Sequence, residues 1–177
     1  DALTMIEVAR DEGGVMPRVF GVNHHPEIVN RARLLVTLEK QFERGDVSGE
    51  LFSTLTDQLA ALPIPSVCAL NGNVFGGGAE IALCCDYRIG VDDVRLLVPA
   101  ARIGICYPLN GLQRYVDKLG LGAAKRILVA SEELAAETLL AIGFLHRTVP
   151  RERLGAESEA FARHLAAAQE RGLPVII

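Results

Sequence analysis

The sequence predicts a single α/β domain in which strands alternate with helices and the strands run largely parallel. Two observations support this prediction: apolar residues recur at helical spacing in several segments, and short apolar runs of strand length lie between those segments. The chain has 177 residues, half of them hydrophobic, which is enough to bury a core without disulfides or a structural metal. We find no internal repeat, low-complexity tract or linker that would divide it.

Helices and strands are placed by their apolar spacing and by the residues that end them. Leu51, Leu55 and Leu59 recur at helical spacing, and the prolines that follow end that helix. The run "SVCAL" reads as a strand buried on both faces. In chain order we predict a strand at 3–9, a turn at 10–17, a loop at 18–27, helices at 27–44 and 51–62, a strand at 66–72, a helix at 79–85, strands at 87–91 and 95–99, helices at 111–119, 123–129 and 134–142, a strand at 144–149 and a helix at 151–170.

Composition and charge exclude several classes of protein. The formal net charge is −4 and no cluster of Lys or Arg offers a track for phosphates, so we expect no nucleic-acid partner. No apolar run reaches the roughly 18 residues of a membrane span, and the first residues lack the pattern of a signal peptide, so we expect a cytoplasmic protein that does not bind membranes. The four cysteines lie in apolar runs without C-x-x-C spacing, which favours core packing over metal or disulfide use.

Three consecutive glycines, Gly76, Gly77 and Gly78, stand between a buried strand and a helix. Glycine costs conformational entropy on folding, so a triplet needs a reason. A helix that begins after such a turn presents free N–H groups, which suit an anion or a carbonyl oxygen that gains negative charge during a reaction. Nucleotide binding is disfavoured, because neither G-x-G-x-x-G nor G-K-[ST] is present. Tight packing of the helix on the sheet stays open as a purely structural reason.

The stretch "PIPSVCALNGNVFGGGAEIALCCDYRIG" resembles the core of the crotonase superfamily, the enoyl-CoA hydratases and isomerases. The resemblance continues in order through "VPAARIG", the G-x-Q-R helix start and the "V-P" ending, and covers residues 63–150. It implies a spiral of ββα units with C-terminal helices and, here, an incomplete N-terminal unit. We therefore expect residues 1–150 to form the crotonase-like core and residues 151–177 a C-terminal helical segment. It also implies a role in fatty acid metabolism and a homotrimer or hexamer.

In the family this chain resembles, two backbone N–H groups form an oxyanion hole around the carbonyl oxygen of an acyl-CoA thioester. The middle glycine of the triplet, Gly77, matches one donor, and the second would come from the "VFGVN" loop, at Phe20 or Gly21. This loop is two residues shorter than the family's and carries Asn where Asp is usual. The resemblance implies that no separate cofactor or metal is needed, because coenzyme A is part of the substrate. Substrate-binding positions implied by the same motifs are Val22, Asn23, Gly76, Ala100 and Gly111.

The proton-transfer residues depart from the hydratase pattern. Glu80 matches the first catalytic glutamate, but the second falls at Ala100, which cannot transfer a proton. Glu80 could act alone, as in isomerisation, or its carboxylate could simply be stabilised by the dipole at the start of the helix. Tyr107 matches a tyrosine of the methylmalonyl-CoA decarboxylase branch, with turn packing as the alternative. Arg114 begins a helix near the acyl pocket in the family, where a packing or capping role is equally open.

These features lead to one leading hypothesis and two alternatives. We expect an acyl-CoA enzyme of the enoyl-CoA hydratase/isomerase type that stabilises a thioester enolate, with Glu80 as its acid–base residue. The alternatives are a decarboxylase or other lyase, favoured by Ala100 and Tyr107, and a non-catalytic acyl-CoA binder. The adjacent histidines His24 and His25 lack the spacing of a helical metal site, so we expect them to face solvent, with a place on the path of CoA as the other possibility.

Overall fold

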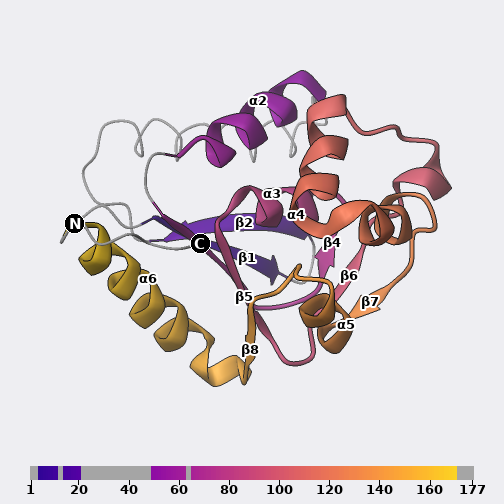
Figure 1. Ribbon diagram of the computed structural model, residues 1–177. Coiled ribbons are helices and arrows are strands. Elements are labelled where there is room, and N and C mark those ends of the chain that lie inside the picture. Colours follow the sequence, from indigo (N-terminus) through magenta and orange to yellow (C-terminus); the bar gives the residue numbers. More distant parts are fainter. Residues whose placement is uncertain (1–3, 12–13, 21–48, 63–64, 171–177) are drawn as a thin grey trace.

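The computed structural model describes residues 4–11, 14–20, 49–62 and 65–170 (Figure 1). Its strands are β1 (Thr4–Asp11), β2 (Gly14–Phe20), β3 (Ser66–Leu70), β4 (Val74–Phe75), β5 (Tyr87–Val91), β6 (Arg95–Leu97), β7 (Leu134–Ala135) and β8 (Arg147–Val149). Its α-helices are α2 (Gly49–Ala60), α3 (Gly77–Cys84), α4 (Leu109–Leu128), α5 (Ala136–Ala141) and α6 (Leu154–Glu170), and two short 3₁₀ helices are η1 (Ala100–Ile103) and η2 (Arg151–Arg153).

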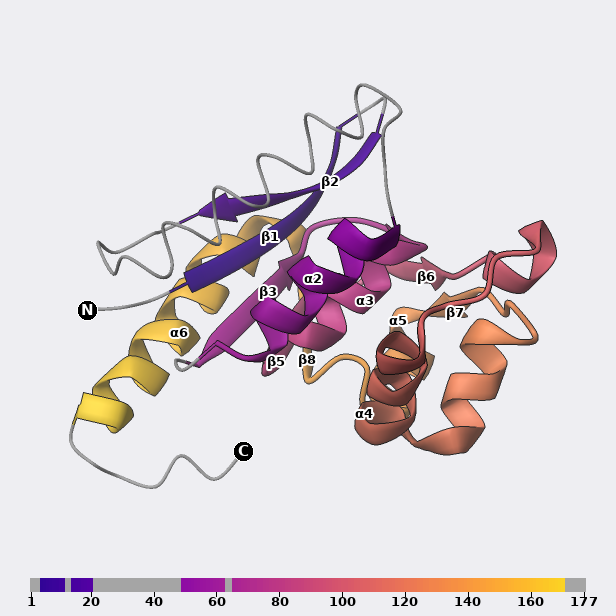
Figure 2. The same cartoon turned by 90° about the horizontal axis from the view of Figure 1, so that it is seen from above.

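The larger sheet has five strands in the order β2-β1-β3-β5-β8. All its neighbours are parallel except β1 and β2, which confirms the predicted parallel connections. Helices α2 and α3 lie on one face of this sheet and α6 on the other (Figures 1 and 2). Strand β3 is buried at all five positions because it has a strand on each side and helices over both faces.

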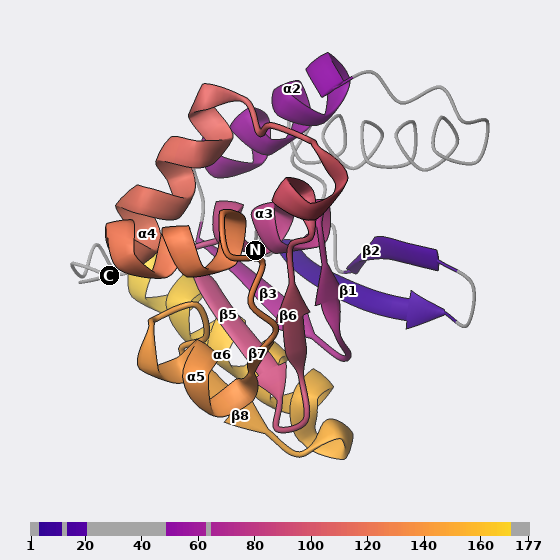
Figure 3. The ribbon, with the colours of Figure 1, turned by 90° about the vertical axis from the view of Figure 1, so that its right-hand side faces the viewer.

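A smaller sheet, in the order β4-β6-β7, positions the glycine triplet (Figure 3). Strand β4 pairs in parallel with β6, and β7 pairs with the other side of β6 in the antiparallel sense. Directly after β4, the N–H of Gly76 donates a hydrogen bond of 3.0 Å to the carbonyl of Leu97. The turn that begins α3 is therefore tied to the end of β6.

The prediction at the N-terminus was partly wrong. The strand at 3–9 is confirmed, but the turn and loop predicted at 10–27 give way up to residue 20 to a hairpin, in which β2 pairs along its length with β1 (Figure 2). Pro17 is accommodated because β2 is an edge strand, where a missing N–H need not break a ladder. The predicted helix at 27–44 lies outside the described residues. Most of the rest of the N-terminal unit, which the resemblance implied to be incomplete, lies outside them as well.

Three helical predictions are refined. The helices expected at 111–119 and 123–129 form one element, α4, that bends at Gly120, whose φ is 78° (Figure 1). The segment at 134–142 begins with the short strand β7, because residues 134 and 135 pair with β6. The helix expected from residue 151 starts as η2 before α6 begins at Leu154. The division at residue 150 stays a prediction.

The cysteine prediction is confirmed for three of the four residues. Cys68, Cys84 and Cys85 are free and buried, whereas Cys106 is exposed, because it lies in the open segment between η1 and α4. Within the part of the chain that the structure describes, we find no helix with the length and apolar character needed to cross a bilayer.

Arg88 on β5 is a buried cation that joins three segments by hydrogen bonds to backbone carbonyls. It is 2% exposed. Its guanidinium donates to Phe144, to Cys85 at 2.7 Å and to Ala82 at 3.4 Å. The arginine therefore joins the end of α3 to the segment between α5 and β8. Nearby, Asp86 accepts hydrogen bonds of 2.8 Å from the N–H and the hydroxyl of Ser66, which fixes the start of β3.

His146 makes the stability of this region depend on pH, and we predict that its protonation destabilises the protein in mild acid. Its Nδ1 accepts a 3.0 Å hydrogen bond from the backbone N–H of Arg88. Partial burial of the ring against Tyr87, and then the charge of Arg88, lower the pKa of His146 to about 4. Between the ordinary pKa near 6.5 and that value, the unfolded chain binds the proton more readily, so stability should fall as pH falls through this window.

The measurement is the urea midpoint at pH 7 and pH 5 for the wild type and His146→Asn. Asparagine can keep the acceptor near Nδ1 but does not titrate. We expect the wild type to lose more stability than the variant between the two pH values. Equal losses in both proteins would contradict the assignment.

Candidate active site

The glycine turn presents backbone N–H groups at the start of α3. Gly76 has φ of 51°, which L side chains rarely adopt, and its N–H is already bonded to Leu97. Gly77 is the first residue of α3, where N–H groups have no partner inside the helix. A Cβ on Gly77 would stand 2.9 Å from the ring of Phe52 on α2. Close packing of this ring is thus a second reason for a bare backbone, beside the approach of an acyl group.

A pocket of about 360 Å³ lies beside this turn. It is lined by the start of α3, one residue of α2, the end of the segment after β6, η1 and the segment before α4. Its apolar lining consists of Phe52, Val98, Pro99, Ala100, Ile103, Ile105 and Pro108. The other lining residues are Gly76, Gly77, Glu80, Cys106 and Tyr107. Among these described lining residues, Glu80 is the one carboxylate and there is no cation.

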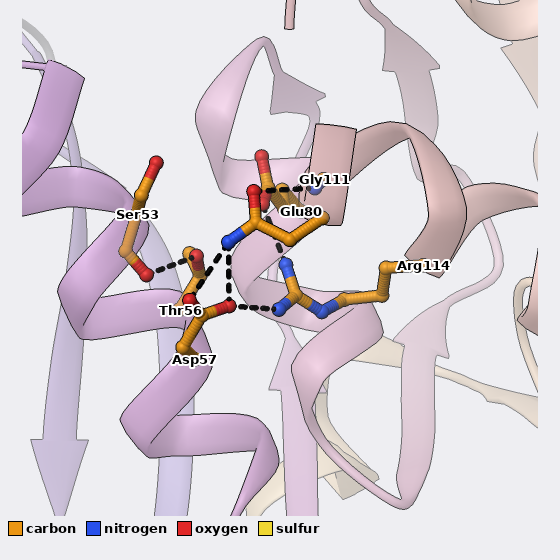
Figure 4. Close-up of polar contacts among 7 residues, drawn as sticks. Ser53, Thr56, Asp57, Glu80, Gly111 and Arg114 are labelled. Carbon is orange, nitrogen blue, oxygen red and sulfur yellow. Dashed lines mark hydrogen bonds and ion pairs between the residues drawn. The ribbon is translucent and has the colours of Figure 1, made fainter. Parts of the chain in front are cut away.

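Glu80 stands in the first turn of α3 and is only 2% exposed. Its Oε1 accepts a hydrogen bond of 2.6 Å from Arg114 on α4 (Figure 4). Its Oε2 is buried without a hydrogen-bond partner among the described residues. The carboxylate also lies against the Cα of Gly111, where a Cβ would stand 3.0 Å from Oε1. Gly111, predicted to bind substrate, is therefore placed against the catalytic candidate and is not among the residues that line the pocket.

Burial raises the pKa of Glu80 above its ordinary value, and this effect exceeds the opposing attraction of Arg114. The Thr56 hydroxyl also lowers it, although that hydroxyl donates its own 3.1 Å hydrogen bond to the carbonyl of Ser53. A carboxyl with a raised pKa is a better match for proton transfer near neutral pH than an exposed one. Glu80 therefore lines the pocket with a pKa above that of an exposed carboxyl, and both properties suit an acid–base residue.

Ala100 and Tyr107 also line the pocket. Ala100 begins η1, is 6% exposed and lines the same pocket as Glu80. The position predicted to correspond to a second glutamate therefore holds a methyl group. The ring of Tyr107 packs edge-on against that of Tyr115, with 5.9 Å between centroids. Burial, and then the negative charge of Glu80, raise the pKa of Tyr107 to about 12, so its phenol stays protonated at neutral pH and can donate a hydrogen bond.

Most of the site residues predicted for the segment around Phe20 lie outside the described residues. Phe20 ends β2, and its backbone is paired with Met5. Gly21, Val22, Asn23, His24 and His25 lie outside the described residues. The second oxyanion donor and the two positions predicted to bind substrate in this loop remain predictions. Among the residues described, no group of three His, Cys, Asp or Glu side chains is placed to hold a metal ion.

The profile of the Enoyl-CoA hydratase/isomerase family matches residues 33–173, most of the chain. The chain belongs to the enoyl-CoA hydratase/isomerase family. The crotonase-like fold predicted from its motifs is thereby confirmed. The matched range includes Gly77, Glu80 and Ala100, the positions on which the site predictions rest.

Solved structures agree with this assignment. ThnE from S. clavuligerus has 34% identity, with 66% of this chain and 59% of that chain covered and a TM-score of 0.62. DspI from Pseudomonas aeruginosa has 30% identity, coverage of 67% and 49%, and a TM-score of 0.64. An enoyl-CoA hydratase from Bacillus anthracis has 26% identity, coverage of 72% and 48%, and a TM-score of 0.64. This family member therefore spans about half to three fifths of the length of these relatives.

The sequence pattern does not reveal the groups that surround Glu80. It places Arg114 at a helix start and does not single out Asp57 or Asn110. In the structure, Arg114 also contacts Asp57 on α2 at 2.8 Å (Figure 4). The Asn110 amide nitrogen donates to both oxygens of Asp57. The G-x-Q-R motif could have singled out Arg114, but no local pattern marks Asp57.

Proposed function

We propose that the protein acts on acyl-CoA thioesters and moves a proton between carbons of the acyl chain, as an enoyl-CoA isomerase does. Glu80 would be the acid–base residue, and the N–H of Gly77 would be one of two donors to the thioester oxygen. The coenzyme A moiety would belong to the substrate, with no separate cofactor. The second donor, from the segment around Phe20 and Gly21, is part of this proposal.

One observation favours isomerisation over hydration: the described lining holds a single carboxylate, Glu80, and an alanine where the second would stand. Addition of water by a carboxylate pair needs two groups that exchange protons, whereas a 1,3-proton shift can use one group twice. The lining around Glu80 is apolar, which also suits an uncharged acyl chain better than a bound water nucleophile.

The proposed step balances without any other reactant. The carboxylate of Glu80 takes the proton from C2 of a 3-enoyl thioester, and the electron pair moves to the carbonyl oxygen to form an enolate. Backbone N–H donors, Gly77 among them, stabilise that charge, each by about 3 kcal/mol. The enolate then collapses, the double bond forms between C2 and C3, and the Glu80 carboxyl returns the proton to C4.

Decarboxylation is a second candidate, and Tyr107 is the observation that favours it. Its phenol lines the pocket and stays protonated, so it could hydrogen-bond a substrate carboxylate and later protonate the enolate. The lining offers no cation to a carboxylate among the described residues, which favours the isomerase reading.

In the test, the protein is incubated separately with a 3-enoyl-CoA, crotonyl-CoA and a methylmalonyl-CoA. The conjugated thioester is followed by ultraviolet absorbance, and the other acyl-CoA products are separated by chromatography. We expect conversion of the 3-enoyl-CoA and little hydration of crotonyl-CoA. Release of carbon dioxide as the main reaction would replace isomerisation by decarboxylation. Calorimetric binding of all three esters without turnover would instead identify a non-catalytic acyl-CoA binder.

We also propose a homotrimer or hexamer, located in the cytoplasm. Large apolar side chains stay exposed around the pocket mouth and on α4: Ile103 is 62% exposed, Ile105 57% and Leu109 78%. Such a patch would suit contact with another copy of the chain.

A further inference from the structure

Arg114 on α4 lies between two carboxylates from different helices (Figure 4). One guanidinium nitrogen donates to Oε1 of Glu80 at 2.6 Å, and the other donates to Oδ1 of Asp57 at 2.8 Å. The side chain of Arg114 is 10% exposed, that of Glu80 3% and that of Asp57 51%. The cation is thus largely buried, with its inner contact on Glu80 and its outer contact on a residue at the surface.

The outer contact is itself held in place. The Asn110 amide nitrogen donates to both oxygens of Asp57, at 2.9 and 2.7 Å. The oxygen of the same amide accepts a 3.0 Å hydrogen bond from the N–H of Gly111. Asp57 is therefore attached to the first two turns of α4 at two points, through Asn110 and through Arg114. The chain of contacts runs from α2 through α4 to Glu80 on α3.

This arrangement makes the two oxygens of Glu80 different. Oε1 is engaged by Arg114, while Oε2 has no hydrogen-bond partner among the described residues. Gly111 closes against the carboxylate, so the group has little room to rotate and exchange its oxygens. A carboxylate held by one oxygen presents the other in a defined direction, which is what proton transfer to carbon requires.

We propose that Arg114 is the positioning residue for Glu80, holding Oε1 so that Oε2 carries the proton, and that Asp57 restrains Arg114 from the side of α2. The proposal rests on the proposed function for what Oε2 does to a substrate. The contacts among the three side chains stand independently of that function.

Charges around Glu80 give the proposal a signature that loss of packing would not produce. The titratable and charged groups that act on Glu80 or are acted on by it are Arg114, Asp57, Tyr107, Tyr115 and Cys84. Arg114 lowers the pKa of Glu80, and Asp57 raises it. Removing Arg114 should therefore raise the pKa of Glu80. Removing the charge of Asp57 should lower it, because the repulsion disappears and Arg114 keeps only Glu80 as its anionic partner.

The first experiment needs no substrate. Glutamate side chains are labelled with ¹³C at the carboxyl carbon, the Glu80 resonance is assigned with Glu80→Gln, and it is titrated in the wild type, Arg114→Met, Arg114→Lys and Asp57→Asn. We expect a higher pKa in Arg114→Met, a lower one in Asp57→Asn, and a value nearer the wild type in Arg114→Lys, which keeps the charge but not the planar fork. An unmoved Glu80 pKa in Arg114→Met, or shifts of the same sign in Arg114→Met and Asp57→Asn, would overturn the proposal.

The second experiment measures turnover of the 3-enoyl-CoA. We expect kcat of Arg114→Met to fall roughly 10- to 100-fold with little change in KM, because the substrate still binds while Oε2 is misplaced. Arg114→Lys should recover part of the loss. The matched control is Arg126→Met on the same helix, which removes an exposed pair with Glu132 and should leave both constants unchanged.

The two experiments separate the two proposals. The predicted pKa shifts without turnover in any of these proteins would support the positioning network and contradict the proposed function. Turnover in the wild type with an unmoved Glu80 pKa in Arg114→Met would support the function and overturn the positioning role. If Arg114→Met does not fold, the lower Glu80 pKa expected in Asp57→Asn still decides, and an unmoved or higher value there would overturn the proposal.

Discussion

A Glu80→Gln variant is expected to lose about 10²- to 10⁴-fold in turnover of an enoyl-CoA substrate, the usual contribution of a positioned acid–base group. Glutamine keeps the shape of the side chain and can still accept the hydrogen bond from Arg114, but it cannot take a proton from carbon. Steady-state kcat is the measurement. Affinity for the CoA ester, measured by calorimetry, should change by only a few fold because the pocket stays intact.

The matched control is Glu132→Gln, since Glu132 is a 42%-exposed carboxylate paired with Arg126 and outside the pocket lining. It should leave kcat unchanged. Full activity in Glu80→Gln would remove Glu80 from the mechanism and would leave Tyr107 and Cys106 as the proton-transfer candidates among the described lining residues.

Replacement of Arg88 by methionine is expected to destabilise the fold by at least about 2 kcal/mol, because the carbonyls of Cys85 and Phe144 lose a charged donor inside the core and each unsatisfied group costs about 1–3 kcal/mol. The carbonyl of Ala82 keeps a hydrogen bond from the N–H of Cys85. The urea midpoint, converted to the free energy of unfolding, is the measurement. Arg88→Lys should fall between the wild type and Arg88→Met, since one ammonium cannot reach all three carbonyls.

Arg147→Met is the control for loss of a cation at the surface. Arg147 is exposed and pairs with Glu157 at 3.0 Å, so its removal should cost less than about 1 kcal/mol. If Arg88→Met cost no more than this control, the buried hydrogen bonds would not be what holds the end of α3 to the segment before β8.

The fold was predictable where local pattern and burial agree. The "SVCAL" run became β3 because a strand covered on both faces is apolar at every position. The hairpin strand β2 was missed because Pro17 and the preceding glycines indicate a turn, and only pairing with β1 makes the segment extended. Likewise, β4 and β7 have two residues each, too few for any period, and exist because β6 lies between them.

The sequence by itself determined the family, the turn at Gly77 and the carboxylate three residues later, because residues that begin one helix are held together by local geometry. It also showed that Ala100 cannot supply a second acid–base group. Only the tertiary structure decided which groups surround Glu80. Arg114 is 34 residues from Glu80 and 57 from Asp57 in the chain. These three meet because helices α2, α3 and α4 pack against one another. Because tertiary packing decides which residues pair with such a charge, no periodicity or fixed spacing in the sequence marks the pair.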